Sequence, residues 1–246
     1  MKHTRLIYGF HAVLARMRSQ PKSIVEIMLD ENRNDSRAAA ILSQVELAGI
    51  RLIRVPKRRL DGLDSTGRHQ GLIALAEILP THGTLDVLLD ELKAPPFLLI
   101  LDGVTDPHNL GACLRVADAA GVNAVIAPKD HAAGINAVVS KVASGAAEVI
   151  PYFMVANLAR TIGELKERDI WIVGADERAN VTLYQSSFPK AIAWVLGAEG
   201  KGMRRLTRER CDQIVRIPML GSVGSLNVSV ASGICLFESR HHQRAW

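Results

Sequence analysis

The first 77 residues have the pattern of apolar and polar positions expected of a small α/β unit. Apolar residues at helical spacing predict a helix over residues 8–17. A second helix is predicted over residues 36–48, because Gly49 follows it directly and glycine is favoured just beyond a helix C-terminus. Short apolar runs predict three strands, at 23–29, 51–55 and 71–77.

Residues 78–96 differ from the chain on either side. Pro80 and Gly83 precede one short helical stretch at 85–92, and Pro95 and Pro96 follow it; glycine and proline interrupt regular structure. This segment is therefore predicted to be a linker. It separates a unit over residues 1–77 from a larger unit over residues 97–246.

From Phe97 onward, strand-like runs alternate with helical stretches. The strand-like runs are FLLILD, AVIAP, VIPYF, WIVGAD, AIAWVLG and VRIPM, and the helical stretches lie at 110–120, 136–144, 158–168 and 228–240. Runs that are apolar throughout are typical of strands buried on both faces. The pattern therefore indicates an α/β fold in which helices cover a parallel sheet.

Composition narrows the class of protein further. No apolar run approaches the ~20 residues needed to cross a bilayer, and the N-terminus has no signal-type apolar stretch, so no membrane association is expected. Cys113, Cys211 and Cys235 are scattered and odd in number, which argues against a disulfide framework. The eight histidines form no HxxxH pair beside carboxylates, so no metal is expected. A reducing cytoplasm is the expected location.

The net charge of +5 lies entirely in the first 77 residues, which hold 13 Lys and Arg against 8 Asp and Glu. Residues 51–59 contain five basic side chains and no acidic one. Such a segment suits a polyphosphate partner such as RNA, and a solvated surface explains it equally well on charge alone. It has no aromatic side chain for base stacking, so contact with RNA phosphates is the expected mode.

Three segments that follow predicted strands carry unusual residues, and ligands of open α/β sheets bind at the carboxyl ends of strands. The first, over residues 101–115, reads as a strand end, a turn and a helix that begins near Asn109. Turn formation and helix capping explain Asp106 and Asn109. They do not explain Arg115 on an otherwise apolar helix, where a guanidinium must reach a carboxylate, a phosphate or solvent.

The second segment, LGAEGKGM at residues 196–203, places three glycines after a strand, which lets backbone approach a ligand closely. Its glycine spacing is neither that of GxGxxG nor that of a P-loop, since no Ser or Thr follows Lys201. Glu199 stands out among the glycines.

The third segment, IPMLGSVGSLNVSVA at residues 217–231, leads from a strand into a helix of small side chains, which suggests tight packing against another backbone. Ser225 is a candidate N-cap, with Asn227 in the first turn. Because Ser225 lacks a GxSxG elbow, a serine hydrolase is not expected.

In order, spacing and residue types, these segments resemble the three motifs of the SpoU/TrmH family of RNA ribose 2′-O-methyltransferases, within the knotted SPOUT superfamily. YGFHAVLARM and HQGLIALAE resemble the two ends of that family's small substrate-binding domain, which is similar to ribosomal proteins. The resemblance implies a deep trefoil knot formed by the second and third segments. It also implies a homodimer with its active site near the subunit interface.

The resemblance further implies that S-adenosyl-L-methionine is the cofactor. It places the cofactor on Gly197, Ile217 and Leu226, with Leu196, Met219 and Ser225 beside them.

For the catalytic site the resemblance implies Arg115, Glu199, Asn109, Ser225 and Asn227. Arg115 matches the family's catalytic arginine. A guanidinium is a poor base, and it is better suited to binding the RNA phosphate and stabilising charge on the oxygen. Glu199 is the alternative proton acceptor or a partner for an arginine. Asn109 orients Arg115 or the ribose, and Ser225 and Asn227 complete the pocket.

The expected function is therefore 2′-O-methylation of a guanosine in 23S ribosomal RNA. A transfer RNA enzyme of the same family is an alternative, and so is a non-catalytic RNA-binding factor of ribosome assembly. A Rossmann-type enzyme is disfavoured, because DGVTDPHN and not a glycine-rich turn follows the first strand of the larger unit.

Overall fold

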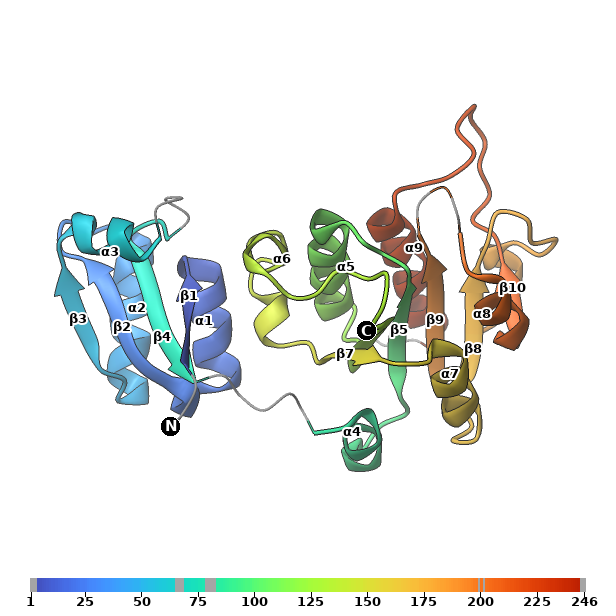
Figure 1. Ribbon diagram of the computed structural model, residues 1–246, viewed down its shortest axis with the longest axis horizontal. Helices are drawn as coiled ribbons and strands as arrows, with labels where there is room; N and C mark the ends of the chain where they lie inside the picture. Colours follow the sequence, from blue (N-terminus) through green and yellow to red (C-terminus); the bar gives the residue numbers. More distant parts are fainter. Residues whose placement is uncertain (1–3, 65–68, 78–82, 199, 201, 244–246) are drawn as a thin grey trace. The chain divides into compact units, whose positions relative to one another are not determined.

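The computed structural model describes residues 4–64, 69–77, 83–198, 200 and 202–243 (Figure 1). The chain forms two compact units. Unit 1 comprises Met1–Pro80 together with Ser144–Val149, and unit 2 comprises Thr81–Ala143 and Ile150–Trp246. The change from one unit to the other after Pro80 falls within the segment predicted to be a linker.

Unit 1 is built on a four-stranded sheet in the order β1-β4-β2-β3. Its strands are β1 (Thr4–Tyr8), β2 (Ile24–Asp30), β3 (Leu52–Val55) and β4 (Leu72–Glu77). Strand β4 runs antiparallel to both β1 and β2, whereas β2 and β3 are parallel. The sequence analysis missed β1, and it placed the other three strands within one residue of their observed ends.

The helices of unit 1 are α1 (Phe10–Ser19), α2 (Ser36–Ala48) and α3 (Lys57–Leu63), with short 3-10 turns η1 (Pro21–Ser23) and η2 (Ala146–Glu148). Helix α2 has the predicted bounds because both of its ends are capped. The Asp35 side chain accepts hydrogen bonds from the backbone N–H groups of Arg37 and Ala38, and Gly49 adopts a left-handed conformation with φ 63°.

Two apolar clusters hold unit 1 together. Helices α1 and α2 pack through Phe10, Val13 and Ile41 onto one face of the sheet. Leu60 of α3 packs with Met28 and Ile73 in a separate cluster. Helix α3 was not predicted, because a single buried leucine among basic residues gives no helical periodicity.

Unit 2 contains a six-stranded sheet in which every neighbouring pair is parallel, as predicted. The strand order is β10-β8-β9-β5-β6-β7. The strands are β5 (Phe97–Asp102), β6 (Ala124–Pro128), β7 (Tyr152–Val155), β8 (Trp171–Ala175), β9 (Ile192–Gly197) and β10 (Gln213–Val215). All six residues of β5 are buried, which agrees with a strand covered on both faces.

Helices cover both faces of this sheet (Figure 1). They are α4 (Leu85–Glu91), α5 (Pro107–Ala119), α6 (Ala137–Val142), α7 (Leu158–Lys166), α8 (Arg205–Arg210) and α9 (Val228–His242), with a 3-10 turn η3 (Leu183–Gln185). Side chains of α4 and α7 pack with Leu98 and Ile100 of β5 in one cluster. On the other face, the Trp194 indole N–H donates to Ser239 of α9 at 2.7 Å.

Strand β10 ends earlier than the predicted VRIPM run. Its pairing stops at Val215, and residues 216–219 leave the sheet. Pro218 has no N–H to donate to a neighbouring strand, so the ladder cannot continue through it. The residues that leave the sheet become available to form a wall of a pocket.

The three cysteines form no disulfide, and Cys113 and Cys235 are buried. Burial raises the pKa of Cys211 to about 12. No helix in the described part of the chain is long and apolar enough to cross a membrane.

We expect Gly111→Ala to destabilise unit 2 by about 1–3 kcal/mol, because overpacking a close helix contact costs energy of this size. A Cβ at Gly111 in α5 would lie 2.7 Å from Val142 Cβ and 2.9 Å from the carbonyl oxygen of Val139 in α6. Urea unfolding monitored by circular dichroism measures the change.

Gly163→Ala is the matched control, because Gly163 also lies within a helix and no atom of the described residues lies within 4 Å of the position that a Cβ would take there. This variant should gain stability, by up to ~1 kcal/mol, from helix propensity alone. Equal effects of the two substitutions would contradict the packing argument.

Candidate active site

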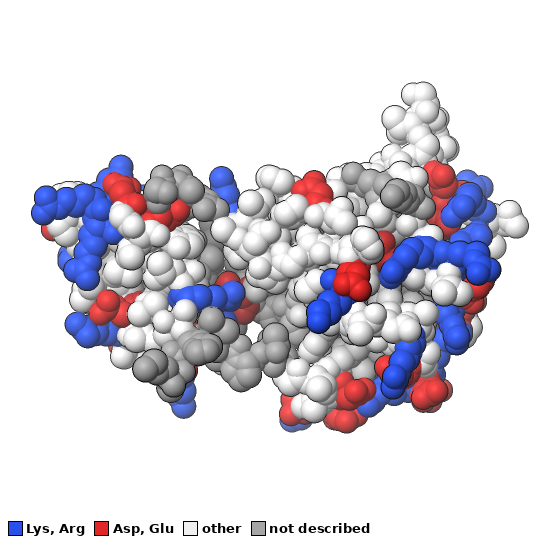
Figure 2. Space-filling model, in the orientation of Figure 1, with Lys and Arg blue, Asp and Glu red and all other residues white. Residues whose placement is uncertain are grey.

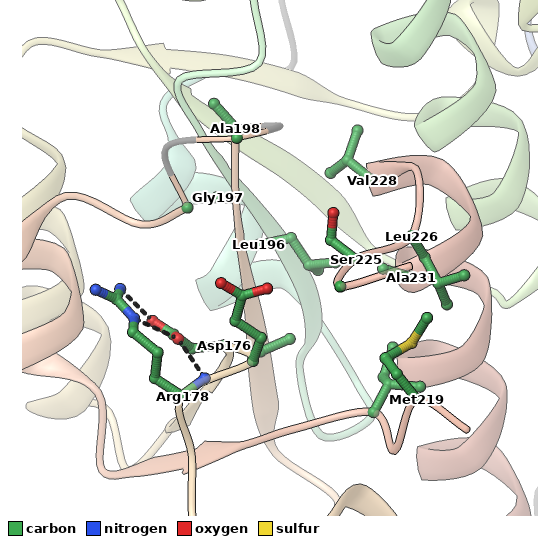
Figure 3. A pocket seen from close by; sticks show the side chains of 16 residues that line it. Asp176, Arg178, Leu196, Gly197, Ala198, Met219, Ser225, Leu226, Val228 and Ala231 are labelled. Atoms are coloured by element: carbon green, nitrogen blue, oxygen red, sulfur yellow. Dashed lines mark hydrogen bonds and ion pairs between the residues drawn. The ribbon is translucent and has the colours of Figure 1, made fainter. Parts of the chain in front are cut away.

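A pocket of about 450 Å³ lies at the carboxyl ends of the neighbouring strands β8 and β9 (Figure 3). Segments far apart in the sequence line it. They are Ala175–Arg178 after β8, Leu196–Ala198 with Gly200 and Gly202, Ile217 and Met219, Gly224–Leu226, and Val228 and Ala231 of α9. Its size suits a small organic ligand or cofactor, and its lining combines apolar side chains with polar and charged ones.

The floor of the pocket requires glycine at position 197. A Cβ there would lie 2.0 Å from the carbonyl carbon of Gly202 and 2.1 Å from the backbone nitrogen of Met203. Gly202 has a positive φ of 65°, and its N–H donates to the Ala198 carbonyl at 2.8 Å. The close approach of the two backbone segments therefore explains the glycines of this loop.

Asp102 fastens both ends of the same loop to β5. Its backbone carbonyl accepts from the Ala198 N–H at 3.1 Å. Its side chain, which is fully buried, accepts from the backbone N–H of Arg204 at 2.9 Å and from Arg204 Nε at 2.6 Å. One residue thus fixes the start and the end of residues 198–204.

Asn227 joins the third sequence segment to the first. It caps α9 by accepting from the Ser229 N–H at 2.9 Å, and its Nδ2 donates to Asn109 Oδ1 at 2.8 Å. The expectation that Ser225 caps this helix is therefore wrong, since the helix begins two residues later. Asp106 caps α5 in a similar way by accepting from the His108 N–H.

The structure brings together every residue that was expected to hold a cofactor. Leu196, Gly197, Ile217, Met219, Ser225 and Leu226 all line the pocket. Arg115 lies exposed on α5 and does not line it. Asn109 is half-buried beside Asn227, and Glu199 lies outside the described residues.

The sequence analysis missed the residues that follow β8. Asp176 is buried and accepts from Arg178 Nε at 2.9 Å and Arg178 Nη2 at 2.8 Å, and Arg208 Nε lies 3.2 Å from the same carboxylate. The hydrogen bonds from Arg178 hold the pKa of Asp176 below its ordinary value. The run WIVGAD predicted strand β8. Only the observed order of the strands shows that the end of β8 lies beside β9.

The basic segment that sequence analysis singled out lies in unit 1. Arg51, Arg54 and the three residues Lys57, Arg58 and Arg59 of α3 are all exposed. Arg51 Nε lies 3.1 Å from Glu26, and Arg54 donates to the Glu31 carbonyl at 3.1 Å. Figure 2 shows Lys and Arg side chains gathered over the part of unit 1 that Figure 1 labels β3 and α3.

In the described part of the chain, no group of three or more His, Cys, Asp or Glu side chains is arranged to hold a metal ion. The described lining of the pocket consists of apolar side chains, glycine backbone, Ser225, Glu177 and the Asp176–Arg178 ion pair.

An open parallel sheet with a pocket at its strand ends is typical of the class of α/β proteins that bind a small ligand there. The chain belongs to the SpoU rRNA methylase family, whose model matches residues 96–237. A second model, described as RNA 2′-O ribose methyltransferase substrate binding, matches residues 6–81.

Known proteins match nearly the full chain. The 23S rRNA (guanosine-2′-O-)-methyltransferase RlmB of Bordetella pertussis is 59% identical over 97% of this chain and 98% of its own length. A crystal structure described as an RNA 2′-O ribose methyltransferase is 26% identical, with a TM-score of 0.78 over 99% of this chain and 90% of its own. The Aquifex aeolicus TrmH/SpoU tRNA modifying enzyme is 29% identical, with a TM-score of 0.56 over 62% of this chain and 78% of its own.

We expect Arg204→Met to lower the free energy of unfolding by about 1–3 kcal/mol, because it leaves the buried Asp102 carboxylate without its charged partner. Chemical denaturation measures this loss. Arg205→Met is the matched control, since Arg205 is 82% exposed and pairs only with Glu209 within its own helix in the described structure. That control should change stability by less than ~0.5 kcal/mol. Comparable losses in both variants would argue against the role of Asp102.

Proposed function

We propose that this protein transfers a methyl group from S-adenosyl-L-methionine to the ribose 2′-hydroxyl of a guanosine in 23S ribosomal RNA. The observation that carries the proposal is the 59% identity to RlmB across 97% of the chain. The convergence of six expected cofactor residues on one pocket supports it independently of that identity.

The pocket fits the adenosine part of this cofactor. Leu196, Ile217 and Leu226 offer apolar surface to a purine, and Gly197 lines the pocket beside them. When bound, S-adenosyl-L-methionine supplies a methyl group that is activated by the adjacent positive sulfur. The residues of the chain hold the donor in place and align it with the ribose, which lowers the entropic part of the barrier.

The acceptor side is proposed to lie near Asn109, Asn227 and Arg115. The Asn109–Asn227 hydrogen bond holds the first turn of α5 against the start of α9, beside Val228 of the pocket. Arg115 binds an RNA phosphate and stabilises negative charge on the attacking oxygen, which suits a permanently charged guanidinium. Glu199 is proposed as the proton acceptor or as the partner of an arginine, and Ser225 as a pocket residue that completes the site.

We infer a homodimer, because one chain alone does not place Arg115 in the lining of its pocket. A second copy can bring an exposed arginine to the pocket of the first. We also infer a trefoil knot formed by residues 196–203 and 217–231. Residues of both segments line the same pocket, which supports the knot.

Residues 1–77 are proposed to bind RNA through the exposed basic side chains of β3 and α3, with a fold akin to that of ribosomal proteins. Residues 78–96 were expected to form a linker, but α4 within this range packs with Leu98 and Ile100 of unit 2, so the proposed linker ends before Leu85. Residues 97–246 are proposed to form the catalytic domain together with α4. The family model for substrate binding, which matches residues 6–81, supports this division of roles. A ribosomal RNA substrate places the enzyme in the cytoplasm.

Ribosomal RNA is preferred over transfer RNA as the substrate. The tRNA modifying enzyme from Aquifex aeolicus matches only 62% of this chain, whereas the 23S rRNA enzyme matches 97%. A non-catalytic assembly factor is disfavoured, because it has no need of a pocket built from all six expected cofactor residues.

We predict that Arg115→Ala lowers methyl transfer to unmodified 23S rRNA by about 10²–10³-fold, as expected when a group that stabilises the transition state is lost. Incorporation of labelled methyl groups measures the rate, and calorimetry should show unchanged affinity for S-adenosylhomocysteine. Arg160→Ala is the control, since Arg160 is also exposed but pairs with Glu164 on α7. Wild-type activity in Arg115→Ala would refute its role, and label in transfer RNA alone would refute the substrate.

Replacing Lys57, Arg58 and Arg59 together by alanine should weaken RNA binding. The salt dependence of binding should also become shallower, by ~0.9 in log–log slope for each phosphate that the protein no longer neutralises. Filter binding at several salt concentrations measures both. Alanine at Lys93, Arg160 and Lys190 removes the same charge from exposed sites of unit 2 and is the control. An equal effect of the two triple variants would show that α3 supplies only general positive charge.

A further inference from the structure

One acidic side chain of the pocket stands without a role in the site described above. Among the described residues, three charged side chains line the pocket, and all three follow β8. Asp176 and Arg178 bond to one another through two nitrogens of the guanidinium. Glu177 between them is exposed and has no hydrogen-bond or ion-pair partner among the described residues. Its carboxylate is therefore free to accept hydrogen bonds from a ligand.

The carboxylate of Glu177 reaches toward the third sequence segment. Its Oε2 lies 3.8 Å from the position that a Cβ on Gly224 would take, and Gly224 also lines the pocket. Ser225 and Leu226, which follow Gly224 directly, are among the residues expected to contact adenosine. Figure 3 shows Asp176 and Arg178 on one side of the pocket and Met219 and Leu226 on the other. Glu177 thus lies where the residues that follow β8 approach Ser225 and Leu226, which are expected to contact adenosine.

The chemistry of the cofactor narrows what this carboxylate can bind. The faces of the purine ring suit apolar contacts, and Leu196, Ile217, Met219 and Leu226 supply a matching surface. The ribose attached to the purine carries two neighbouring hydroxyl donors, and an acidic side chain after a strand of an open α/β sheet is a recurrent acceptor for ribose hydroxyls. Hydrogen bonds to an ionised acceptor are stronger than those between neutral groups.

We propose that Glu177 binds the 2′- and 3′-hydroxyls of the cofactor ribose and so selects an adenosine-containing ligand. The proposal rests on the function proposed above. It assigns Glu177 to cofactor binding and gives it no part in proton transfer. Because the side chain is exposed, its substitution leaves the core of unit 2 intact.

Isothermal titration of the full-length protein with S-adenosylhomocysteine and its 2′-deoxy and 3′-deoxy analogues tests the proposal. Glu177→Ala should weaken binding of S-adenosylhomocysteine by roughly tenfold, the size expected for losing hydrogen bonds to a charged group. Wild-type protein should also lose affinity for each deoxy analogue, whereas Glu177→Ala should bind all three ligands about equally. Glu177→Gln, which keeps an acceptor oxygen, should fall between the two.

Glu209→Gln is the matched control, since Glu209 is an exposed carboxylate of α8 that does not line the pocket. Methylthioadenosine, which has the diol but no amino-acid part, should lose as much affinity in Glu177→Ala as S-adenosylhomocysteine does. A loss confined to S-adenosylhomocysteine would overturn the proposal, because the carboxylate would then meet the ammonium group. Equal discrimination against deoxy analogues by the variant and the wild type would overturn it as well.

The same titrations separate this inference from the function on which it rests. Binding of S-adenosylhomocysteine by the wild type, with no change in Glu177→Ala, overturns the role of Glu177 alone. Failure of the wild type to bind any of these ligands overturns both.

Discussion

The pocket of unit 2 depends on the pairing of Asp102 with Arg204. A carboxylate that is fully buried is costly unless hydrogen bonds and an opposite charge compensate it, and Arg204 supplies both through its backbone N–H and its guanidinium. Because the Asp102 carbonyl also holds Ala198, the residues between 198 and 204 are fixed at both ends. The glycine backbone that forms the floor of the pocket is therefore placed before any ligand arrives, and preorganisation of this kind reduces the cost of binding.

A second strand end, two strands away in the sheet, carries a similar buried carboxylate–arginine pair. Asp176 follows β8 and Asp102 ends β5, and β9 lies between these two strands. Each carboxylate is buried and holds an arginine whose side chain is half or more exposed. The apolar strands explain the stability of the sheet, while the polar residues just beyond them shape the pocket. This separation allows the site to be polar without placing an uncompensated charge in the core.

Much of the architecture could be predicted from the sequence, because local chemistry determines it. Apolar runs located the strands of the parallel sheet, and Gly49 marked the end of α2. The expected cofactor residues followed from the resemblance of three segments to known motifs. Strand order could not be predicted, since it depends on long-range packing, and the residues after β8 were therefore overlooked. The cap of α9 was misplaced for a related reason: Asn227 is selected by its contact with Asn109, which is distant in the sequence.

In the proposed arrangement, the residues that hold the cofactor are separate from the residue that contacts RNA. Buried or half-buried residues such as Leu196 and Ile217 line the pocket, and the Asp102–Arg204 and Asp176–Arg178 pairs support its edges. Arg115, in contrast, is exposed on α5. Asn109, in the first turn of the same helix, is hydrogen-bonded to Asn227. An arginine held by a buried carboxylate has part of its donor capacity occupied, whereas a solvated one keeps all of it for a phosphate. The exposure of Arg115 therefore fits a group that acts on RNA and not on the cofactor.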